Sequence, residues 1–281
     1  MDAKAIANGT LAALDTGQYT AQDGTTVAIG DLLAACVSGT QCYEPDALDD
    51  IYQRVVARPG AYSATTFAVE HETPLQGCAR LVARQQYQRI GVLNFASARK
   101  PGGGFLAGAV AQEESLARSS GLYLSLRQCS QFYDYHRAQD TSLYSDRMIY
   151  SPACPVVRDD AGNWLSRPYM VDFITSPAPN AGAVMRNDPD NRERIVPVLS
   201  KRAGKVLALA AYWQCDALVL GAWGCGVFRN DPATVATIFA GYLGVGGAFY
   251  QRFHHVLFAV HDRSPGRDTY QAFAARCAHL G

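Results

Sequence analysis

The chain has 281 residues, of which 48% are hydrophobic, 10% aromatic and 18% charged, so it can bury a large core. This composition excludes intrinsic disorder, collagen and coiled coil. The 25 basic and 25 acidic side chains give a formal net charge of zero, which argues against a broad surface for duplex DNA but leaves room for a local anion site.

The apolar segments bear on where the chain resides. The longest runs, residues 206–213 and 256–260, are far shorter than the roughly 20 residues that a bilayer demands. Residues 1–15 alternate apolar with polar side chains and lack the apolar centre of a signal peptide. We therefore expect a cytoplasmic protein with no membrane partner.

The eight cysteines contain no C-x-x-C pair, so neither a zinc site nor a disulfide lattice is expected. Scattered thiols of this kind are typically small buried hydrophobes. The cysteines are Cys36, Cys42, Cys78, Cys129, Cys154, Cys215, Cys225 and Cys277. Cys225 differs from the others because it lies inside a glycine turn.

The first sixty residues are predicted to form a helical lead-in. Helical patterns cover residues 3–14 and 45–57, separated by a hairpin-like polar stretch at 19–29 and an Ala- and Leu-rich segment at 31–37. No repeat or long linker separates this lead-in from the rest. We expect one domain spanning residues 1–281.

The core begins after Pro59 and Gly60, where the hydrophobic pattern changes to alternation. Residues 65–71 are predicted as a strand, 74–88 as a helix and 89–95 as a buried strand, which together make a βαβ unit. Strands continue to alternate with helices to the end of the chain. This order predicts an α/β fold, a three-layer α/β/α sandwich with a mixed central sheet.

The later elements complete this expected pattern. Strands are predicted at 147–151, 156–158, 169–175, 217–221 and 254–261, and helices at 113–128, 191–214, 232–243 and 265–280. The proline-containing middle strands either form a ligand rim or a structural hairpin, and the hairpin is the preferred interpretation.

The first candidate site joins a strand end, a triple glycine and an acidic helix start. Its members are Asn94, Gly102, Gly103, Gly104, Gln112, Glu113 and Glu114. Consecutive glycines leave backbone amides bare, so such a loop can wrap a diphosphate or a ribose. A flexible turn is the plain alternative.

The acid pair has two explanations. The helix dipole favours anions in the first turn, which alone would account for Glu113 and Glu114. The pair also follows a loop that leaves a strand end, where α/β sheets bind ligands. Because adjacent helical residues point about 100° apart, one carboxylate can face a ligand while the other orients it.

A second glycine turn follows the strand at 217–221 and precedes a helix. It contains Gly221, Gly224 and Gly226. Asn230 or Asp231 is a natural N-cap, with Pro232 at the first helical position. Phe228 either stacks on a base or sugar or simply packs. Two such turns indicate one long ligand that carries phosphates.

Other chemistry is poorly supported. Cys225 could be a nucleophile only with a histidine base, and no Cys–His signature accompanies the histidines of the last predicted strand, His254, His255 and His261. The remaining histidines, His71, His136 and His279, show no ligand spacing, so no metal is predicted.

The triple glycine, seven intervening residues and then QEE resemble the GGG-x(6–8)-QEE signature of poly(ADP-ribose) glycohydrolases. The chain looks most like the compact bacterial type, also found in filamentous fungi. Further blocks that look like this family are VLNFASARKPGGGF, QEESLARSSGLYLSL, IYSPACPVVRD, ITSPAPN and LVLGAWGCGVFRNDP. The resemblance covers roughly residues 60–280. It implies a macrodomain that binds ADP-ribose, here with an N-terminal helical extension.

The resemblance also implies roles for single residues. Glu114 would be the catalytic acid, and Glu113 would hold the ribose hydroxyls near the scissile bond. Substrate contacts are implied at Asn94, Gly102, Gly103, Gly104, Val110, Gln112, Gly224, Cys225, Gly226, Val227 and Phe228. Arg229 stands where a glycine is expected, which leaves the conformation of the second loop open.

The implied activity is cleavage of ribose–ribose O-glycosidic bonds of poly(ADP-ribose) from chain ends, with ADP-ribose as product. Partners would be the polymer or ADP-ribosylated macromolecules, the protein would be a monomer, and neither metal nor cofactor is needed. A glycosidic acid catalyst requires a raised pKa. Burial and Glu113 would raise the pKa of Glu114, whereas the helix N-terminus would lower it. The sequence therefore leaves open whether the net pKa shift is upward or downward.

Two other interpretations of the pocket remain. A macrodomain reader would bind ADP-ribose without hydrolysis, although a reader has no need of Glu114. A mono-ADP-ribosyl hydrolase would share the pocket and differ in the leaving group. A dinucleotide-dependent oxidoreductase ranks below both, because G-x-G-x-x-G is absent from the first βα turn.

Overall fold

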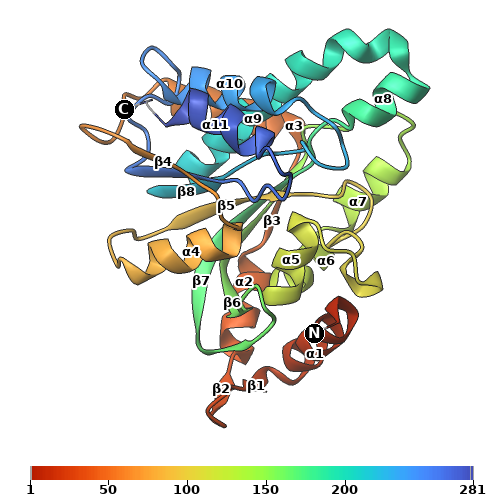
Figure 1. The fold of residues 1–281 in the computed structure, drawn as a ribbon, viewed down its shortest axis with the longest axis vertical. Helices are drawn as coiled ribbons and strands as arrows, with labels where there is room; N and C mark the ends of the chain where they lie inside the picture. The colour runs from red at the N-terminus through yellow and green to blue at the C-terminus, as the bar shows by residue number, and fades with distance from the viewer. Residues whose placement is uncertain (1, 279, 281) are drawn as a thin grey trace.

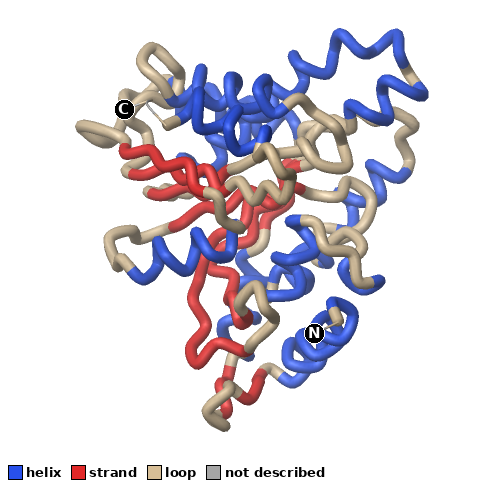
Figure 2. The backbone as a smooth tube through the Cα atoms, in the orientation of Figure 1, coloured by secondary structure: helices blue, strands red, loops and turns tan. Residues whose placement is uncertain are grey.

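A computed structural model describes residues 2–278 and residue 280, and it arranges them as a central sheet between two layers of helices (Figures 1 and 2). The helices are α1 (Ala3–Thr16), α2 (Gly30–Gly39), α3 (Pro45–Val56), α4 (Pro74–Ala83), η1 (Phe105–Ala107), α5 (Gln112–Ser119), α6 (Leu122–Arg127), α7 (Ser130–Arg137), α8 (Ala181–Asn187), η2 (Pro189–Arg194), α9 (Ile195–Tyr212), α10 (Pro232–Leu243) and α11 (Asp268–Cys277). The strands are β1 (Gln18–Thr20), β2 (Thr26–Ala28), β3 (Gln41–Tyr43), β4 (Thr66–Glu70), β5 (Ile90–Phe95), β6 (Met148–Arg158), β7 (Trp164–Ser176), β8 (Ala217–Leu220) and β9 (His255–Ala259).

The central sheet has seven strands in the order β3-β6-β7-β5-β8-β9-β4. The run from β7 to β4 is parallel throughout, whereas β6 is antiparallel to both of its neighbours. The predicted mixed sheet is therefore confirmed. The carboxyl ends of β5, β7, β8 and β9 lie at one edge, where open α/β sheets bind their ligands.

Alternation along the parallel strands explains why helices cover both faces. In β5, Val92 packs into the core beneath α4, and Leu93 packs into the core beneath α9. In β9, Leu257 and Phe258 divide between the two cores in the same way. Because successive strand side chains point to opposite faces, two apolar faces must each be covered. Figure 1 shows α3, α9, α10 and α11 on one side and α2, α4, α5 and α6 on the other.

The lead-in helix α1 packs directly on the loop that follows β5. Ala7 forms a small apolar cluster with Phe105 of η1 and Ala117 of α5. The Thr10 hydroxyl donates to the Arg118 carbonyl oxygen at 2.6 Å and accepts from Arg158 Nε at 2.9 Å. The lead-in is thus joined to the core through buried contacts next to the glycine loop.

Three predicted elements differ in the structure. The helix predicted over 113–128 divides into α5 and α6, because Ser120 is extended and bridges to Val156, and Gly121 N donates to Pro155 O. The strands predicted at 147–151 and 156–158 form one strand, β6, with a register shift near Ala153, whose φ is +43°.

The boundaries of other elements also shift. The helix predicted over 191–214 begins as the 3-10 turn η2 and becomes α-helical only in α9. The short elements β3, α7 and α8 were not predicted from the hydrophobic pattern. The predicted helix 265–280 is the shorter α11, and His279 lies outside the described residues.

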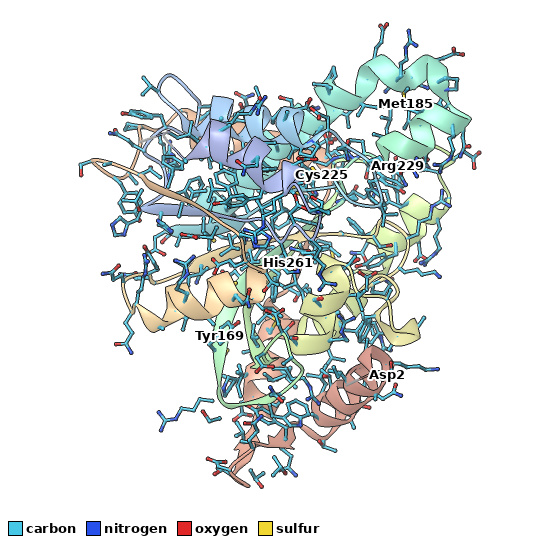
Figure 3. All side chains as sticks on the ribbon, viewed as in Figure 1. Asp2, Tyr169, Met185, Cys225, Arg229 and His261 are labelled. Carbon is cyan, nitrogen blue, oxygen red and sulfur yellow. A yellow bond between two sulfur atoms is a disulfide. The ribbon has the colours of Figure 1, made fainter. Side chains whose placement is uncertain are left out.

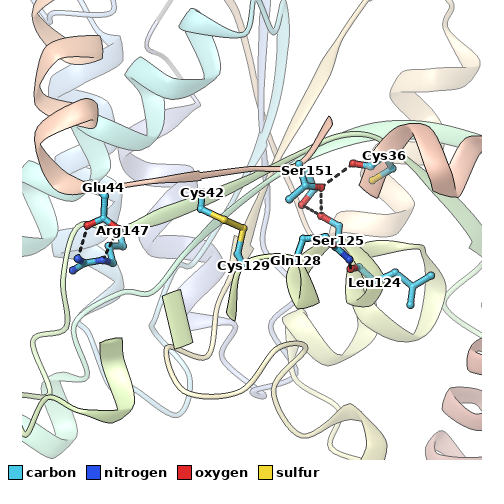
Figure 4. The surroundings of a disulfide bond; sticks show 10 residues. Cys36, Cys42, Glu44, Leu124, Ser125, Gln128, Cys129, Arg147 and Ser151 are labelled. Atoms are coloured by element: carbon cyan, nitrogen blue, oxygen red, sulfur yellow. Dashed lines mark hydrogen bonds and ion pairs between the residues drawn. A yellow bond between two sulfur atoms is a disulfide. The ribbon is translucent and has the colours of Figure 1, made fainter. Parts of the chain in front are cut away.

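A disulfide joins Cys42 of β3 to Cys129, which precedes α7 (Figure 4). The expectation that the scattered cysteines are free thiols is wrong for this pair, because residues 87 apart in sequence meet only through the sheet topology. Five other cysteines are buried as predicted, and Cys225 is partly buried.

No helix within the described part of the chain is long and apolar enough to cross a membrane.

Candidate functional site

The start of α5 is fixed to the end of β5 by Gln112. Its Nε2 donates to Leu93 O at 2.8 Å, and its Oε1 accepts from Phe95 N at 2.9 Å. Gln112 therefore satisfies two backbone groups of the strand end. This contact places the two following glutamates directly above the carboxyl edge of the sheet.

Glu113 points inward and is 3% exposed. Its Oε2 accepts from Ser97 N at 2.7 Å, and its Oε1 accepts from Asn94 Nδ2 at 3.3 Å. Burial raises the pKa of the Glu113 carboxyl to about 8, and the neighbouring Glu114 charge adds to this, although the hydrogen bonds oppose it. The structure therefore raises the pKa of the inner member of the pair.

Glu114 is half-buried and faces the glycine loop, where its Oε1 accepts from Gly104 N at 2.9 Å. Gly103 has φ of +60°, and a Cβ at this position would lie 2.3 Å from Glu114 Oε1 and 3.1 Å from Glu113 Oε2. A side chain could not fit there without moving both carboxyls. The triple glycine is thus a fitted surface beneath the acids and not merely a flexible turn.

Asn94 is fully buried beneath Glu113. Besides its bond to Glu113, the amide Nδ2 donates to Thr175 Oγ1 at 3.1 Å, while Oδ1 has no hydrogen-bond partner within the described part of the chain. The structure therefore places Asn94 under the acid and not on the open surface of the site.

The second glycine turn follows β8 and leads into α10. Asp231 is the N-cap of α10, where its carboxylate accepts from Thr234 N at 2.8 Å. Asn230 has a different task, because its Nδ2 donates to Pro179 O at 2.8 Å and to Gly224 O at 3.1 Å. This settles which of the two residues caps the helix. Gly226 and Val227 are exposed at the tip of the turn.

Arg229 takes the backbone conformation of the glycine that was expected there, with φ of +57°. Its side chain packs against Gly182, where a Cβ would lie 3.0 Å from Arg229 Cδ, and Gly182 N donates to Phe228 O at 2.9 Å. Phe228 is partly buried, and its ring centroid lies 5.9 Å from that of Tyr144. The turn is therefore supported from behind by the segments around Tyr144 and Gly182.

Arg202, which sequence reasoning missed, holds these supporting segments together. This buried side chain donates to Pro177 O at 2.8 Å and Leu143 O at 3.1 Å, and its Nε bonds to Asp146 Oδ1 at 3.0 Å. A charged residue within a long apolar helix was the signal that could have revealed it, because arginine is rarely fully buried unless it is paired.

A cavity of about 990 Å³ lies between the start of α5 and the turn after β8. Of the predicted residues, Val110, Gln112, Cys225 and Gly226 line it, and Figure 3 shows Cys225 with His261, another lining residue. Glu113, Glu114 and the triple glycine are not among the lining residues. Gln112 and Ser115, the residues on either side of the glutamate pair, do line it.

Much of the cavity wall was not predicted from the sequence. It comes from Thr73 to Gln76 at the start of α4 and from Val260 to Arg263 after β9. Ala3 and Ile6 of the lead-in and Ala161 of the β6–β7 turn also line the cavity. These segments are far apart in sequence and meet only in the fold.

The cysteine and histidine chemistry stays weak. Burial raises the pKa of the Cys225 thiol to about 12, which disfavours a thiolate nucleophile. His71 and His136 each bond to a backbone carbonyl oxygen. No group of three or more histidine, cysteine or acidic side chains among the described residues could hold a metal ion.

Comparisons with known proteins match this arrangement. Residues 7–159 match a family model described as the catalytic domain of microbial-type PARG. A search of the curated proteins finds no match. The solved poly(ADP-ribose) glycohydrolase of Thermomonospora curvata is 51% identical, with 98% of each chain covered and a TM-score of 0.93.

Two ligand-bound structures are also similar. The Thermomonospora curvata enzyme bound to the inhibitor ADP-HPD is 50% identical, again over 98% of each chain, with a TM-score of 0.91. The Deinococcus radiodurans enzyme in complex with ADP-ribose is 46% identical over 87% of this chain and 96% of that one, with a TM-score of 0.82. With its macrodomain-like sheet, its two glycine turns and its glutamate pair, this chain belongs to the microbial-type poly(ADP-ribose) glycohydrolase family.

Proposed function

We propose that this poly(ADP-ribose) glycohydrolase removes ADP-ribose units from the ends of the polymer, with Glu114 as the catalytic acid and base. The observation that carries the proposal is the division between two adjacent carboxyls. Glu113 is buried on Asn94 and Ser97, whereas Glu114 is half-buried and reaches the glycine loop. The Glu113 carboxyl is therefore fixed by its contacts, and the Glu114 carboxyl remains accessible to a substrate.

The terminal ADP-ribose unit would occupy the cavity between the start of α5 and the turn after β8. The amides of residues 224–228 would bind its diphosphate, since bare backbone N–H groups before a helix favour anions. Relatives crystallised with ADP-ribose and with ADP-HPD support a ligand of this class. Phe228 would pack against the ribose, and Glu113 would accept hydrogen bonds from ribose hydroxyls. Asn94 would orient Glu113.

The reaction needs one proton donor that later becomes a proton acceptor. Protonated Glu114 gives its proton to the bridging oxygen while the C1–O bond breaks and its electron pair goes to that oxygen. The ribose left behind carries oxocarbenium character. Water then attacks C1 and gives its proton to the Glu114 carboxylate, which restores the acid. One water molecule is consumed for each ADP-ribose released.

The diphosphate would assist this step. Its negative charge would stabilise a cationic transition state at the neighbouring ribose carbon.

End cleavage is supported by the segments that border the cavity. Ala3 and Ile6 of α1 and Ala161 of the β6–β7 turn line it on the side of the lead-in. In the proposed mode of binding, these residues would limit the room for a further ADP-ribose unit beyond the terminal one. We also propose that the lead-in and the core fold as one domain, because Ala7, Phe105 and Ala117 share a buried cluster.

The test is release of ADP-ribose from purified polymer in the presence of a chelator, followed by chromatography. Wild type should release ADP-ribose, and Glu114→Gln should release none at a detectable rate while still binding ADP-ribose. Glu193→Gln, an exposed glutamate on η2, is the matched control and should behave as wild type. Full activity of Glu114→Gln would contradict the mechanism. Binding by wild type without any release would instead favour a reader or a single-unit hydrolase.

A further inference from the structure

Three exposed basic side chains gather next to the glycine loop, outside the cavity. Arg99 and Lys100 lie in the turn after β5, where Ser97 Oγ accepts from both of their backbone N–H groups at 3.3 and 3.2 Å. Arg137 comes from α7, and its Nη1 donates to Arg99 O at 2.8 Å. We call Arg99, Lys100 and Arg137 the outer basic cluster.

The members of this cluster are held together by contacts between separate elements. Arg99 Nη2 donates to Gln139 O at 3.4 Å, beyond the end of α7. Arg137 pairs with Asp134 at 2.5 Å, whereas no carboxylate of the described residues forms an ion pair with Arg99 or Lys100. Two cations therefore remain uncompensated in a chain whose formal net charge is zero.

The outer basic cluster adjoins the two carboxyls. Ser97 N donates to Glu113, and Lys100 O accepts from Gly103 N at 3.0 Å, directly below Glu114. No described residue between 96 and 109 lines the cavity, whose wall on α5 is formed by Gln112, Ser115, Leu116 and Arg118. The loop that carries Arg99 and Lys100 therefore contacts the two carboxyls and lies outside the cavity lining.

This placement matters for the part of the polymer that departs. If the terminal unit fills the cavity and the scissile bond lies at Glu114, the next unit must extend on the other side of the carboxyls. Each unit of the polymer carries a diphosphate, and arginine and lysine are the side chains that bind phosphate oxygens most strongly.

We propose that the outer basic cluster binds the diphosphate of the second ADP-ribose unit, the one that leaves with the bridging oxygen. This inference rests on the proposed function. It assigns the cluster to polymer recognition, separate from the residues that hold the terminal ADP-ribose. The cluster therefore acts on affinity for the polymer and not on the chemistry of bond cleavage.

The test compares two substrates. One is poly(ADP-ribose), and the other is ADP-ribose carrying a neutral 4-nitrophenyl group at the ribose carbon, which lacks the second diphosphate. Arg99→Gln with Lys100→Gln should lower kcat/KM on the polymer roughly tenfold at low salt, mainly through KM, because two phosphate contacts are lost. Activity on the nitrophenyl substrate and affinity for free ADP-ribose should stay at the wild-type level.

The matched control removes the same charge elsewhere. Arg192→Gln with Arg194→Gln takes two exposed cations from η2 and should leave both substrates unaffected. Added salt should narrow the difference between wild type and the Arg99/Lys100 variant on the polymer, since exposed charges are screened. Arg137→Gln should show a smaller loss of the same kind.

Three results would overturn the inference. Equal loss on both substrates would show that the variant disturbs the carboxyls, no loss on the polymer would show that the cluster binds nothing, and an equal loss in the control would show unspecific attraction. A wild-type chain that cleaves neither substrate would contradict the proposed function itself. In that case, the affinities of the same variants for the polymer and for ADP-ribose would still show whether the outer basic cluster binds the polymer.

Discussion

The two glycine turns look alike in sequence but are built on different contacts. Each leaves a parallel strand and leads into a helix. The turn after β5, which carries the triple glycine beneath Glu113 and Glu114, is called the carboxyl turn below. In this turn, a Cβ on Gly103 would lie 2.3 Å from Glu114 Oε1. In the turn after β8, Gly226 has nothing within 4 Å of where a Cβ would stand, whereas a Cβ on Gly221 would lie 2.4 Å from Ala259 O and one on Gly224 would lie 2.5 Å from Ala178 and Asn230.

The difference shows that glycine serves two physical purposes here. In the carboxyl turn it makes room for side chains that must approach closely. In the turn after β8 it bares backbone amides at the tip, and buried residues such as Asn230 and Arg202 hold the base. A glycine substitution should therefore act through the carboxyls in one turn and through the backbone in the other.

The largest expected effect concerns the buried acid of the carboxyl turn. Because the pKa of Glu113 is raised from 4.5 to about 8, the folded state binds this proton more tightly than the unfolded state. The stabilisation is complete below pH 4.5 and is lost as the pH rises through 8, in total by roughly 5 kcal/mol. Glu113→Gln should remove this loss while also lowering activity.

Urea unfolding at pH 5 and pH 8.5 measures this effect. The free energy of unfolding of Glu113→Gln should equal that of wild type at pH 5 and exceed it at pH 8.5. The surface variant Glu193→Gln should keep the pH dependence of wild type. Other buried acids titrate in all three proteins and cancel in the comparison. An offset between Glu113→Gln and wild type that does not change with pH would refute the assignment.

The next effect concerns the support of the turn after β8. Arg202→Met removes the donors to Pro177 and Leu143 and should lower the free energy of unfolding by about 3 kcal/mol. It should also weaken ADP-ribose binding, because the segment that packs against Phe228 loses its support.

The control is Arg54→Met, which removes an exposed ion pair with Asp50 at 4.0 Å and should lower the free energy of unfolding by less than about 0.5 kcal/mol. Calorimetry checks both, and unchanged ADP-ribose affinity in Arg202→Met would separate this arginine from the site.

Gly103→Ala tests the fitted surface beneath the acids. The added methyl group conflicts with Glu114 and with the positive φ, so activity on the polymer should fall about a hundredfold, as expected for a catalytic group displaced by about 1 Å. ADP-ribose affinity should change less, because the cavity wall does not include Gly103. Steady-state rates and calorimetric binding on the same preparation decide, and near-normal turnover would show that the close fit is unimportant.

Gly226→Ala should have the smallest effect. Its position is open and its φ is not in the left-handed region, so the protein should fold normally and lose less than about threefold in activity. A loss as large as that of Gly103→Ala would erase the contrast between the two turns. It would indicate that the diphosphate approaches Gly226 more closely than any side chain allows.

The local parts of this site could be predicted from sequence. Strand β5, the glycine turn and the start of α5 follow from periodicity and from the order of Gly103 and Glu114 along the chain. The raised pKa of Glu113 could not be predicted, because it depends on burial beneath α5 and on Ser97. The break at Ser120 was also missed, since the bridge to Val156 that causes it is non-local.

The long-range contacts were beyond the sequence for the same reason. Cys42 and Cys129 meet only because β3 lies beside β6. Arg202 acts on carbonyls of two other segments, and no local pattern identifies them. Structural roles that depend on contacts between sequence neighbours could be predicted. Roles that depend on contacts between distant segments could not.

The measurement that tests the central claim most directly is turnover by Glu114→Gln on a substrate that needs neither acid nor base. ADP-ribose with a 4-nitrophenyl leaving group requires little protonation, and azide attacks without deprotonation. We predict that azide restores nitrophenol release by Glu114→Gln while the polymer stays uncleaved. Two results would contradict the role of Glu114 as acid and base. One is cleavage of the polymer by Glu114→Gln at the wild-type rate, and the other is a failure of azide to restore nitrophenol release from the nitrophenyl substrate.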